Sequence, residues 1–309
     1  MSEERAGTLA RMTLEAIRTD DVRFASLPGW PYAPRYVSDL PGYEGMRMHY
    51  VDEGPEDAPV FLCLHGEPTW SYLYRKMIPV FIGSGARVVA PDFFGFGRSD
   101  KPVDDDAYTF DFHRGSLLRL IEHLDLRDIT LVVQDWGGLL GLTIPVDLPE
   151  RISGLLAMNT AIGTGAEPTE GFVAWRDYVA NTPDLDVGRL MKRSCPHLTD
   201  DELAAYDAPF PGPEYKAGVR TFPALVPTSP DADGVDVSRR AVKWWATEFN
   251  GRSFMAIGVT DPVLASVMPR LHQVINGCPL PMMLPDAGHF VQEWGDQVAR
   301  TALAEWEGS

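Results

Sequence analysis

One apolar segment of the chain, residues 129–133 (ITLVV), stops abruptly at Gln134-Asp135-Trp136-Gly137-Gly138 and is followed by apolar residues at helical spacing. A short run rich in β-branched and aliphatic residues favours a strand. The two glycines permit a tight turn and a close approach of the backbone that follows. The segment therefore predicts a strand, a tight turn and a helix, which is the repeating unit of an α/β fold.

The same alternation of strands and helices continues along most of the chain. Further strands are predicted at residues 60–64, 87–90, 152–158, 254–259 and 281–284. Helices are predicted at residues 112–124, 138–148 and 290–306, with two more through Val242, Trp244 and Trp245 and up to Ile275. This pattern indicates an α/β fold with a mostly parallel central sheet flanked by helices.

Residues 161–228 do not follow this alternation of strands and helices. They contain short helical pieces, many prolines and charges, and few β-branched runs. A chain of 309 residues, 45% of them hydrophobic, is long enough for one main domain with a sizeable insertion. We therefore predict a discontinuous α/β core, residues 1–160 and 229–309, that carries a helical cap at residues 161–228.

The chain is strongly acidic, with a formal net charge of −17. Nucleic acids and anionic membrane surfaces are usually bound by clustered Lys and Arg, so we expect neither as a partner. No apolar run reaches the roughly 20 residues that span a bilayer, and the first residues lack the apolar stretch of a signal peptide. We expect a cytoplasmic protein, and a monomer because nothing in the sequence demands an interface.

The three cysteines, Cys63, Cys195 and Cys278, are widely spaced and form no CxxC pair or Cys/His cluster. Such spacing predicts reduced, structural thiols rather than disulfides or a zinc site. We expect no metal, and the chemistry considered below requires no organic cofactor.

Asp135 occupies the position of a catalytic nucleophile. A turn of this kind lifts one side chain to the carboxyl end of the sheet and places the next backbone N–H, that of Trp136, at a helix start. There the N–H can stabilise developing negative charge. The sequence departs from the general pattern G-x-S-x-G, because Val133 replaces the first glycine and a carboxylate replaces the serine. Taken alone, Asp135 is as easily explained as a helix cap.

Two further residues support the catalytic interpretation. Asp261 and His289 each follow a predicted strand, in the chain order of nucleophile, acid and histidine that such a triad requires. This coincidence favours Asp135 as nucleophile, Asp261 as acid and His289 as base over three unrelated structural roles. Asp286 is a rival acid, but its place on the tight loop just before His289 favours a role in shaping that loop.

The loop His65-Gly66-Glu67-Pro68 follows the strand predicted at residues 60–64. One of its backbone N–H groups, which we assign to Glu67, can join that of Trp136 in an oxyanion hole. The His65 imidazole is better interpreted as a core side chain bonded to the backbone.

Five motifs stand out together. They are His65-Gly66-Glu67-Pro68-Thr69-Trp70-Ser71, Pro91-Asp92, Gly95-Phe96-Gly97-Arg98-Ser99-Asp100, Val133-Gln134-Asp135-Trp136-Gly137-Gly138 and Asp286-Ala287-Gly288-His289-Phe290. This set resembles the haloalkane dehalogenases of the α/β-hydrolase superfamily, and more narrowly the branch typified by the dichloroethane-degrading enzyme. The likeness covers both core segments and reaches into the cap at Phe172-Val173-Ala174-Trp175.

The resemblance implies that the chain converts a small halogenated aliphatic substrate and water to a primary alcohol, a halide ion and a proton. An Asp135 oxygen would displace the halide in line and leave an alkyl ester on the enzyme. Water activated by His289, with Asp261 orienting the imidazole, would then attack the ester carbonyl. A serine would form an ether here, which the same groups would not hydrolyse.

The departing halide needs hydrogen-bond donors in a dry pocket. An indole N–H is a donor carried by a large apolar ring. Trp136, beside the nucleophile, is one candidate. The resemblance adds Trp175 of the cap as the second halide-binding residue, and Phe172, one helical turn earlier, is expected to line the same substrate pocket.

Three other functions share some of these features. An epoxide hydrolase has the same fold and nucleophile, and its alkoxide leaving group would be protonated by cap tyrosines, for which Tyr178, Tyr206 and Tyr215 are candidates. A fluoroacetate-type dehalogenase would need cationic groups near the turn, and no obvious set is present. The last alternative is a catalytically silent binding protein on this fold.

Overall fold

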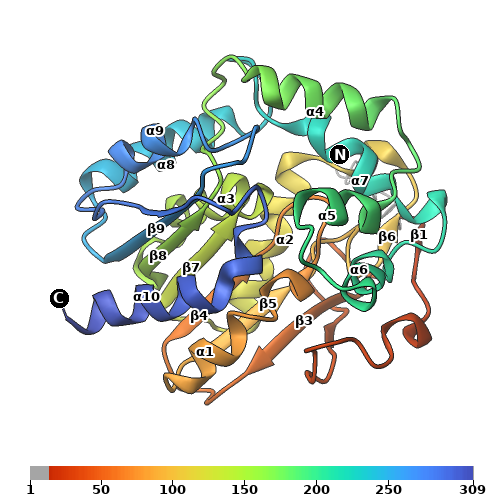
Figure 1. The fold of residues 1–309 in the computed structure, drawn as a ribbon, viewed down its shortest axis with the longest axis horizontal. Helices are drawn as coiled ribbons and strands as arrows, with labels where there is room; N and C mark the ends of the chain where they lie inside the picture. The colour runs from red at the N-terminus through yellow and green to blue at the C-terminus, as the bar shows by residue number, and fades with distance from the viewer. Residues whose placement is uncertain (1–13, 309) are drawn as a thin grey trace, which may run out of the picture.

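An eight-stranded, mostly parallel sheet runs through the centre of the computed structural model, which describes residues 14–308 (Figure 1). Its strand order is β10-β9-β8-β7-β4-β5-β3-β2, and the pairings β2–β3 and β3–β5 are antiparallel. The strands are β2 Arg35–Val37, β3 Met48–Glu53, β4 Val60–Leu64, β5 Arg87–Pro91, β7 Ile129–Gln134, β8 Ile152–Met158, β9 Arg252–Gly258 and β10 Met282–Leu284. A separate antiparallel pair consists of β1 Ala16–Ile17 and β6 Lys101–Pro102. The predicted α/β class is confirmed.

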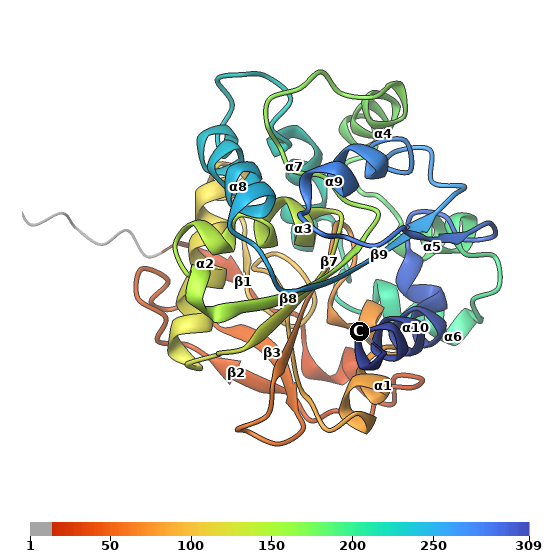
Figure 2. The same cartoon turned by 90° about the vertical axis from the view of Figure 1, so that its left-hand side faces the viewer.

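Helices cover both faces of the sheet, with α1 and α10 on one face and α2, α3 and α8 on the other (Figure 2). Their bounds are α1 Ile78–Gly83, α2 Phe110–His123, α3 Trp136–Gly141, α8 Val235–Thr247, α9 Met268–Val274 and α10 Gly295–Glu307. The helical spacing predicted around residues 112–124 is explained by Leu117, Leu120 and Ile121, which α2 buries against the sheet. Within residues 14–308, no helix is long and apolar enough to cross a membrane.

Four further helices lie over the carboxyl ends of the parallel strands (Figure 1). They are α4 Glu170–Ala180, α5 Val187–Ser194, α6 Asp200–Asp207 and α7 Ala217–Leu225. Thr169, Asp186 and Thr199 begin the first three by accepting hydrogen bonds from backbone N–H groups of the first turn. All four helices fall within the cap predicted at residues 161–228, while the division into domains stays a prediction.

Two predicted helices are divided in the structure. The helix predicted at residues 138–148 starts earlier, at Trp136, and ends at Gly141, before a 3₁₀ turn, η4 Ile144–Val146. Pro145 explains the break, because it lacks an N–H and its ring clashes with the carbonyl of the preceding turn. The closing helix predicted at residues 290–306 consists of η7 Val291–Trp294 and α10. The other 3₁₀ turns are η1 Asp21–Phe24, η2 Ser71–Tyr74, η3 Asp105–Ala107, η5 Pro149–Arg151 and η6 Pro213–Tyr215.

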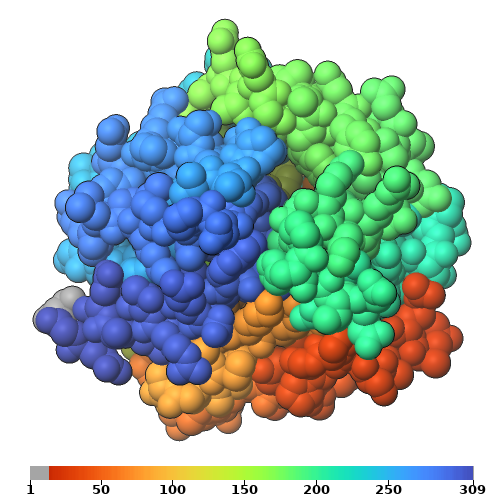
Figure 3. All heavy atoms as spheres, in the orientation of Figure 1, coloured from red at the N-terminus to blue at the C-terminus, as the bar shows by residue number. Residues whose placement is uncertain are grey.

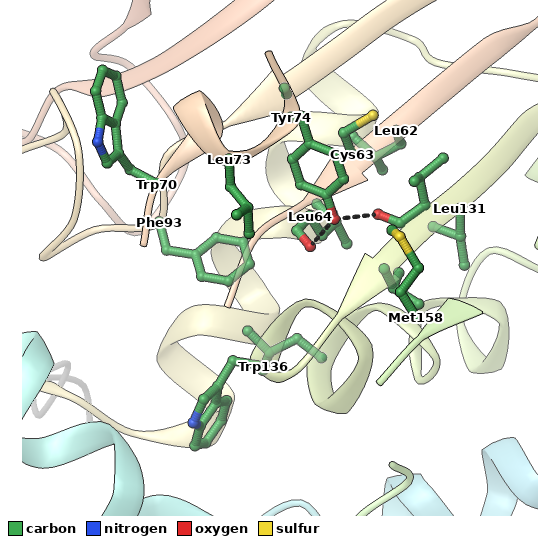
Figure 4. Close-up of a cluster of buried hydrophobic side chains, with 14 of the residues drawn as sticks. Leu62, Cys63, Leu64, Trp70, Leu73, Tyr74, Phe93, Leu131, Trp136 and Met158 are labelled. Carbon is green, nitrogen blue, oxygen red and sulfur yellow. Dashed lines mark hydrogen bonds between the residues drawn. The ribbon is translucent and has the colours of Figure 1, made fainter. Parts of the chain in front are cut away.

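The centre of the sheet is a buried core around β4, β7 and β8 (Figure 4). Leu64, Leu131 and Met158 are fully buried there. The Tyr74 hydroxyl donates a hydrogen bond to the Leu64 carbonyl at 2.7 Å, and the Val132 carbonyl lies 3.1 Å from it. Because a buried hydroxyl needs a partner, this contact fixes η2 against the ends of two strands whose following loops carry polar side chains.

A buried histidine on α2 makes the fold sensitive to acid. His113 is fully buried among aromatic rings, and neither of its ring nitrogens has a hydrogen-bond partner in the described part of the chain. Burial lowers the pKa of His113 to about 3, against 6.5 for an exposed histidine. Below pH 6.5, His113 therefore binds a proton in the unfolded chain but not in the folded chain. The free energy of unfolding falls as the pH falls.

We expect His113→Phe to remove this acid sensitivity. Between pH 7.5 and pH 5 the wild type should lose about 2 kcal/mol of its free energy of unfolding through protonation of His113 in the unfolded chain. The variant has no such loss, because a phenyl ring does not bind a proton. Urea unfolding of both proteins near pH 5 and pH 7.5 measures the effect as a smaller difference between the two pH values in the variant. An equal difference in both proteins would contradict the assignment.

Candidate active site

Asp135 stands on the tight turn between β7 and α3, with φ 50° and ψ −124°. A residue other than glycine rarely adopts a positive φ, and such strain concentrates at functional turns. The two glycines that pack around this turn, Gly137 and Gly66, have no room for a side chain. A Cβ at Gly137 would lie 1.9 Å from the Leu64 carbonyl oxygen, and one at Gly66 would lie 2.4 Å from the Asp135 Cβ. The turn therefore holds the Asp135 carboxylate directly against the loop after β4.

Three side chains from separate strand ends meet at this turn. His289 Nε2 lies 3.5 Å from Asp135 Oδ2, and His289 Nδ1 lies 3.0 Å from Asp261 Oδ2. Asp261 is fixed in turn, because the Asn159 amide donates to Oδ2 at 2.8 Å and the Val263 N–H donates to Oδ1 at 2.8 Å. The structure thus brings together the three residues that the sequence order selected. Asn159, which follows β8, is an addition that the sequence did not predict.

The charges of this group determine the state of the histidine. Burial lowers the pKa of His289, but the charges and hydrogen bonds of Asp261 and Asp135 outweigh it and raise the pKa to about 10. Burial raises the pKa of Asp261, and His289 with the hydrogen bonds from Val263 and Asn159 brings it below the ordinary value. The two neighbouring acidic side chains therefore favour the protonated form of the His289 imidazole.

The loop after β4 also contacts the Asp135 carboxylate. The backbone N–H of Glu67 donates a hydrogen bond to Asp135 Oδ1 at 2.9 Å. His65 is bonded to the backbone, since its Nε2 accepts from the Phe93 N–H at 3.0 Å, which confirms its interpretation as a core histidine. Trp136, whose backbone N–H the sequence assigns to the oxyanion hole, is the first residue of α3 and directly follows Asp135.

A cavity of about 420 Å³ lies in front of the three side chains. The core contributes Asp135, Trp136 and His289 to its wall, and α4 of the cap contributes Phe172 and Trp175. Figure 3 shows a hollow between the green cap segment and the blue C-terminal part of the core. Most of the exposed wall is apolar, so a ligand here meets few polar groups besides those named.

Comparison with known proteins agrees with this arrangement. A family model described as the alpha/beta hydrolase fold matches residues 59–296. A haloalkane dehalogenase of Mycolicibacterium paratuberculosis is 40% identical over 95% of this chain and 99% of its own length. The chain belongs to the haloalkane dehalogenases. One of Mycobacterium tuberculosis is 42% identical over 95% of this chain and 99% of its own. The solved structure of one from Paraglaciecola agarilytica, described as tetrameric, is 54% identical, with a TM-score of 0.93 over 94% of this chain and 98% of its own.

The cap tyrosines of this haloalkane dehalogenase do not form the acid pair that an epoxide hydrolase would need. Tyr178 lines the cavity but is 40% exposed to solvent. Tyr206 is fully buried elsewhere, where its hydroxyl donates to the Glu293 carboxylate, and Tyr215 is not part of the cavity wall. The comparisons and the tyrosine positions therefore both disfavour the epoxide hydrolase alternative.

Proposed function

We propose that Asp135 is the nucleophile of this dehalogenase and attacks the halogen-bearing carbon of a haloalkane. One Asp135 oxygen forms a bond to carbon while the carbon–halogen bond breaks and the halide leaves with its electron pair. The product on the enzyme is a neutral alkyl ester. The single observation that supports this role best is the position of the Asp135 carboxylate, which faces the apolar cavity with a histidine on one side and a backbone N–H on the other.

The second half of the reaction is assigned to His289 and Asp261. Water attacks the ester carbonyl and gives a proton to His289; the bond between the carbonyl carbon and the alkyl oxygen then breaks, and that oxygen takes the proton from His289 and departs as the alcohol. The N–H groups of Glu67 and Trp136 stabilise the oxyanion. Because the charge of Asp135 contributes to the raised pKa of His289, forming the neutral ester lowers that pKa. Alkylation thus makes it easier for His289 to release its proton to solvent, after which the neutral imidazole can accept a proton from water.

Halide binding is assigned to the indole N–H groups of Trp136 and Trp175. Trp136 is 2% exposed and begins α3, so its position is fixed by the core. Trp175 is half-buried on α4 and belongs to the segment proposed as the cap, residues 161–228. Phe172 lines the same cavity, whose volume of about 420 Å³ leaves room for a small halogenated aliphatic chain.

The experiment that tests this assignment is a measurement of bromide release and alcohol formation from 1,2-dibromoethane and 1-bromobutane, run beside styrene oxide. We expect bromide and alcohol in equal amounts and no diol from the epoxide. Diol formation without bromide release would contradict the halide-binding assignment of Trp136 and Trp175. The cytoplasmic location expected from the sequence stays a prediction.

The oligomeric state is a separate proposal. The sequence predicted a monomer, for which the comparisons give no support, since the Paraglaciecola agarilytica enzyme is described as tetrameric. Three of the five large hydrophobic side chains that are exposed in the described residues gather at the β9–β10 edge of the sheet: Val259, Leu280 and Met283, with exposed fractions of 44%, 87% and 55%. We propose that a second copy of this chain pairs with that edge, because an open edge with apolar side chains favours strand pairing.

We expect light scattering to give a mass of at least a dimer for the wild type. Leu280→Lys with Met283→Glu should shift it to the monomer mass without loss of activity, because these residues lie outside the cavity wall. Val22→Lys, at an exposed hydrophobic residue away from this edge, is the matched control. A wild type with the mass of a monomer would contradict this proposal and support the monomer that the sequence predicts.

A further inference from the structure

One arginine of the cavity wall has no role in the mechanism above. Arg193 is the only Lys or Arg side chain among the described residues that line the cavity, and it is exposed to solvent. Within residues 14–308 its guanidinium pairs with no carboxylate, and its contact is with a ring face, since Cζ lies 5.2 Å from the ring centroid of Tyr178. A guanidinium carries five N–H donors and no acceptor, so this group is available to an anionic ligand.

The end of α5 explains a cation at this position only in part. Lys192 and Arg193 both lie in the last turn of α5, where a positive charge interacts favourably with the helix dipole. Lys192 donates hydrogen bonds to the carbonyls of Pro196 and Leu198, at 3.3 and 3.0 Å. The Arg193 side chain makes no such bond in the described part of the chain and forms part of the cavity wall instead.

The charged groups of the cavity differ in their exposure to water. The side chains of Asp135, Asp261 and His289 are at most 17% exposed, whereas Arg193 and Tyr178 are exposed. The Tyr178 ring centroid lies 6.0 Å from that of Trp175, so neighbouring rings lead from Arg193 to the proposed halide site. An anion beside Asp135 would lose its hydration and be repelled, whereas one beside Arg193 would keep contact with water.

The rest of the wall suits an apolar chain. Most of its exposed surface is apolar, and the volume of about 420 Å³ leaves room for a chain of several carbons. A ligand with a halogen at one end and a carboxylate at the other can therefore place each end beside a group of suitable chemistry. The carboxylate must be separated from the halogen-bearing carbon, because Asp135 repels an anion next to that carbon.

We propose that Arg193 gives this enzyme a further class of substrate, halogenated carboxylates in which an apolar chain separates the two ends. Arg193 binds the carboxylate while Asp135 displaces the halide. The reaction takes up one water and yields a hydroxycarboxylate, a halide ion and a proton, and the carboxylate itself is unchanged. This inference rests on the proposed function, because the covalent step is the one assigned to Asp135.

The test compares 6-bromohexanoate with 1-bromohexane, which has the same chain and no charge. The measured quantity is the ratio of kcat/KM for the acid to kcat/KM for the bromoalkane, in which a general change of activity cancels. We expect Arg193→Met to lower this ratio about fivefold, the upper range for an exposed ion pair. The change should appear in KM for the acid and not in kcat, because a carboxylate that does not react is bound equally well throughout the reaction.

Three further variants separate Arg193 from the general charge of the cap. Arg189→Met removes an exposed arginine from the same helix but outside the cavity wall, and it should keep the wild-type ratio. Arg193→Lys keeps the charge and should retain most of the preference. Arg193→Glu should lower the ratio further than Arg193→Met, because it repels the carboxylate. Arg193→Gln replaces Arg193→Met if the latter does not fold.

Bromoacetate tests the need for a separating chain. Its carboxylate is attached to the reacting carbon, so we expect slow bromide release that does not depend on Arg193. An unchanged ratio in Arg193→Met, or an equal fall in Arg189→Met, overturns the proposal. Bromide release from 1-bromohexane without any from 6-bromohexanoate also overturns it and leaves the proposed function intact. If neither 1-bromohexane nor 1,2-dibromoethane yields bromide, the proposed function fails as well.

Discussion

With His289 replaced by Gln, the enzyme is expected to release about one bromide ion per active site and then to stop. Displacement of the halide uses the Asp135 carboxylate and needs no base, so the first step still proceeds. Hydrolysis of the ester needs a group that accepts the proton of the attacking water, and Gln cannot do this. Loss of a general base costs about 10²–10⁴-fold in rate, so the steady-state rate should fall by at least that factor.

Rapid-quench measurement of bromide and mass spectrometry of the protein check this prediction together. The variant should show a burst of bromide and an added alkyl mass on the peptide that contains Asp135. Asp135→Ala is the matched control and should show neither, because it lacks the oxygen that forms the ester. Continued turnover by His289→Gln near the wild-type rate would show that another group activates the water. Adduct on a peptide without Asp135 would contradict the choice of nucleophile.

Much of the fold could be predicted because its central strands are buried on both faces. Residues 60–64 and 152–158 were predicted as strands and coincide with β4 and β8, since a fully buried strand is a continuous apolar run. The antiparallel edge could not be found in this way. β2 is three residues long with an exposed Arg35, and such a short edge strand has no periodic signal.

The catalytic residues of the site could be predicted, because their pattern depends on their order along the chain. The residues that contact them through packing could not. Asp135, Asp261 and His289 each follow a strand, and parallel strands bring their carboxyl ends to one edge of the sheet. Asn159 also follows a strand, but an amide has no place in the triad pattern, so its contact with Asp261 appears only in the structure. The contact between the Glu67 carboxyl and the Trp175 side chain could not be predicted for a different reason. Trp175 comes from the cap, and no local sequence pattern specifies how the cap packs over the core.

A buried ion pair below the site should have the largest effect on stability. Arg75 donates two hydrogen bonds to the Glu293 carboxylate, at 2.7 and 2.8 Å, and a third at 2.8 Å to Glu202 of the cap helix α6. The Arg75 and Glu293 side chains are 3% and 0% exposed. Arg75 follows η2 and Glu293 lies in η7, so the pair joins two segments of the core, one of them directly after His289, and the bond to Glu202 links α6 of the cap to them.

Arg75→Met is expected to lower the free energy of unfolding by about 3 kcal/mol, because removing one partner leaves a buried charge uncompensated. The expected loss is at the lower end of the range for such pairs, since Lys76 still lies 2.9 Å from Glu293 and is only partly exposed. Urea unfolding of Arg75→Met, Glu293→Gln and the double variant measures the coupling between the two residues.

The double variant decides whether the pair itself is responsible. If an unpaired buried charge causes the loss, then adding Glu293→Gln to Arg75→Met removes that charge, and the double variant should be more stable than Arg75→Met alone. Arg119→Met, which breaks an exposed pair with Glu122 on α2, should change stability little. Additive losses in the double variant would instead mean that Arg75 stabilises the fold through the packing of its side chain against Tyr72 and Tyr206, and not through its charge.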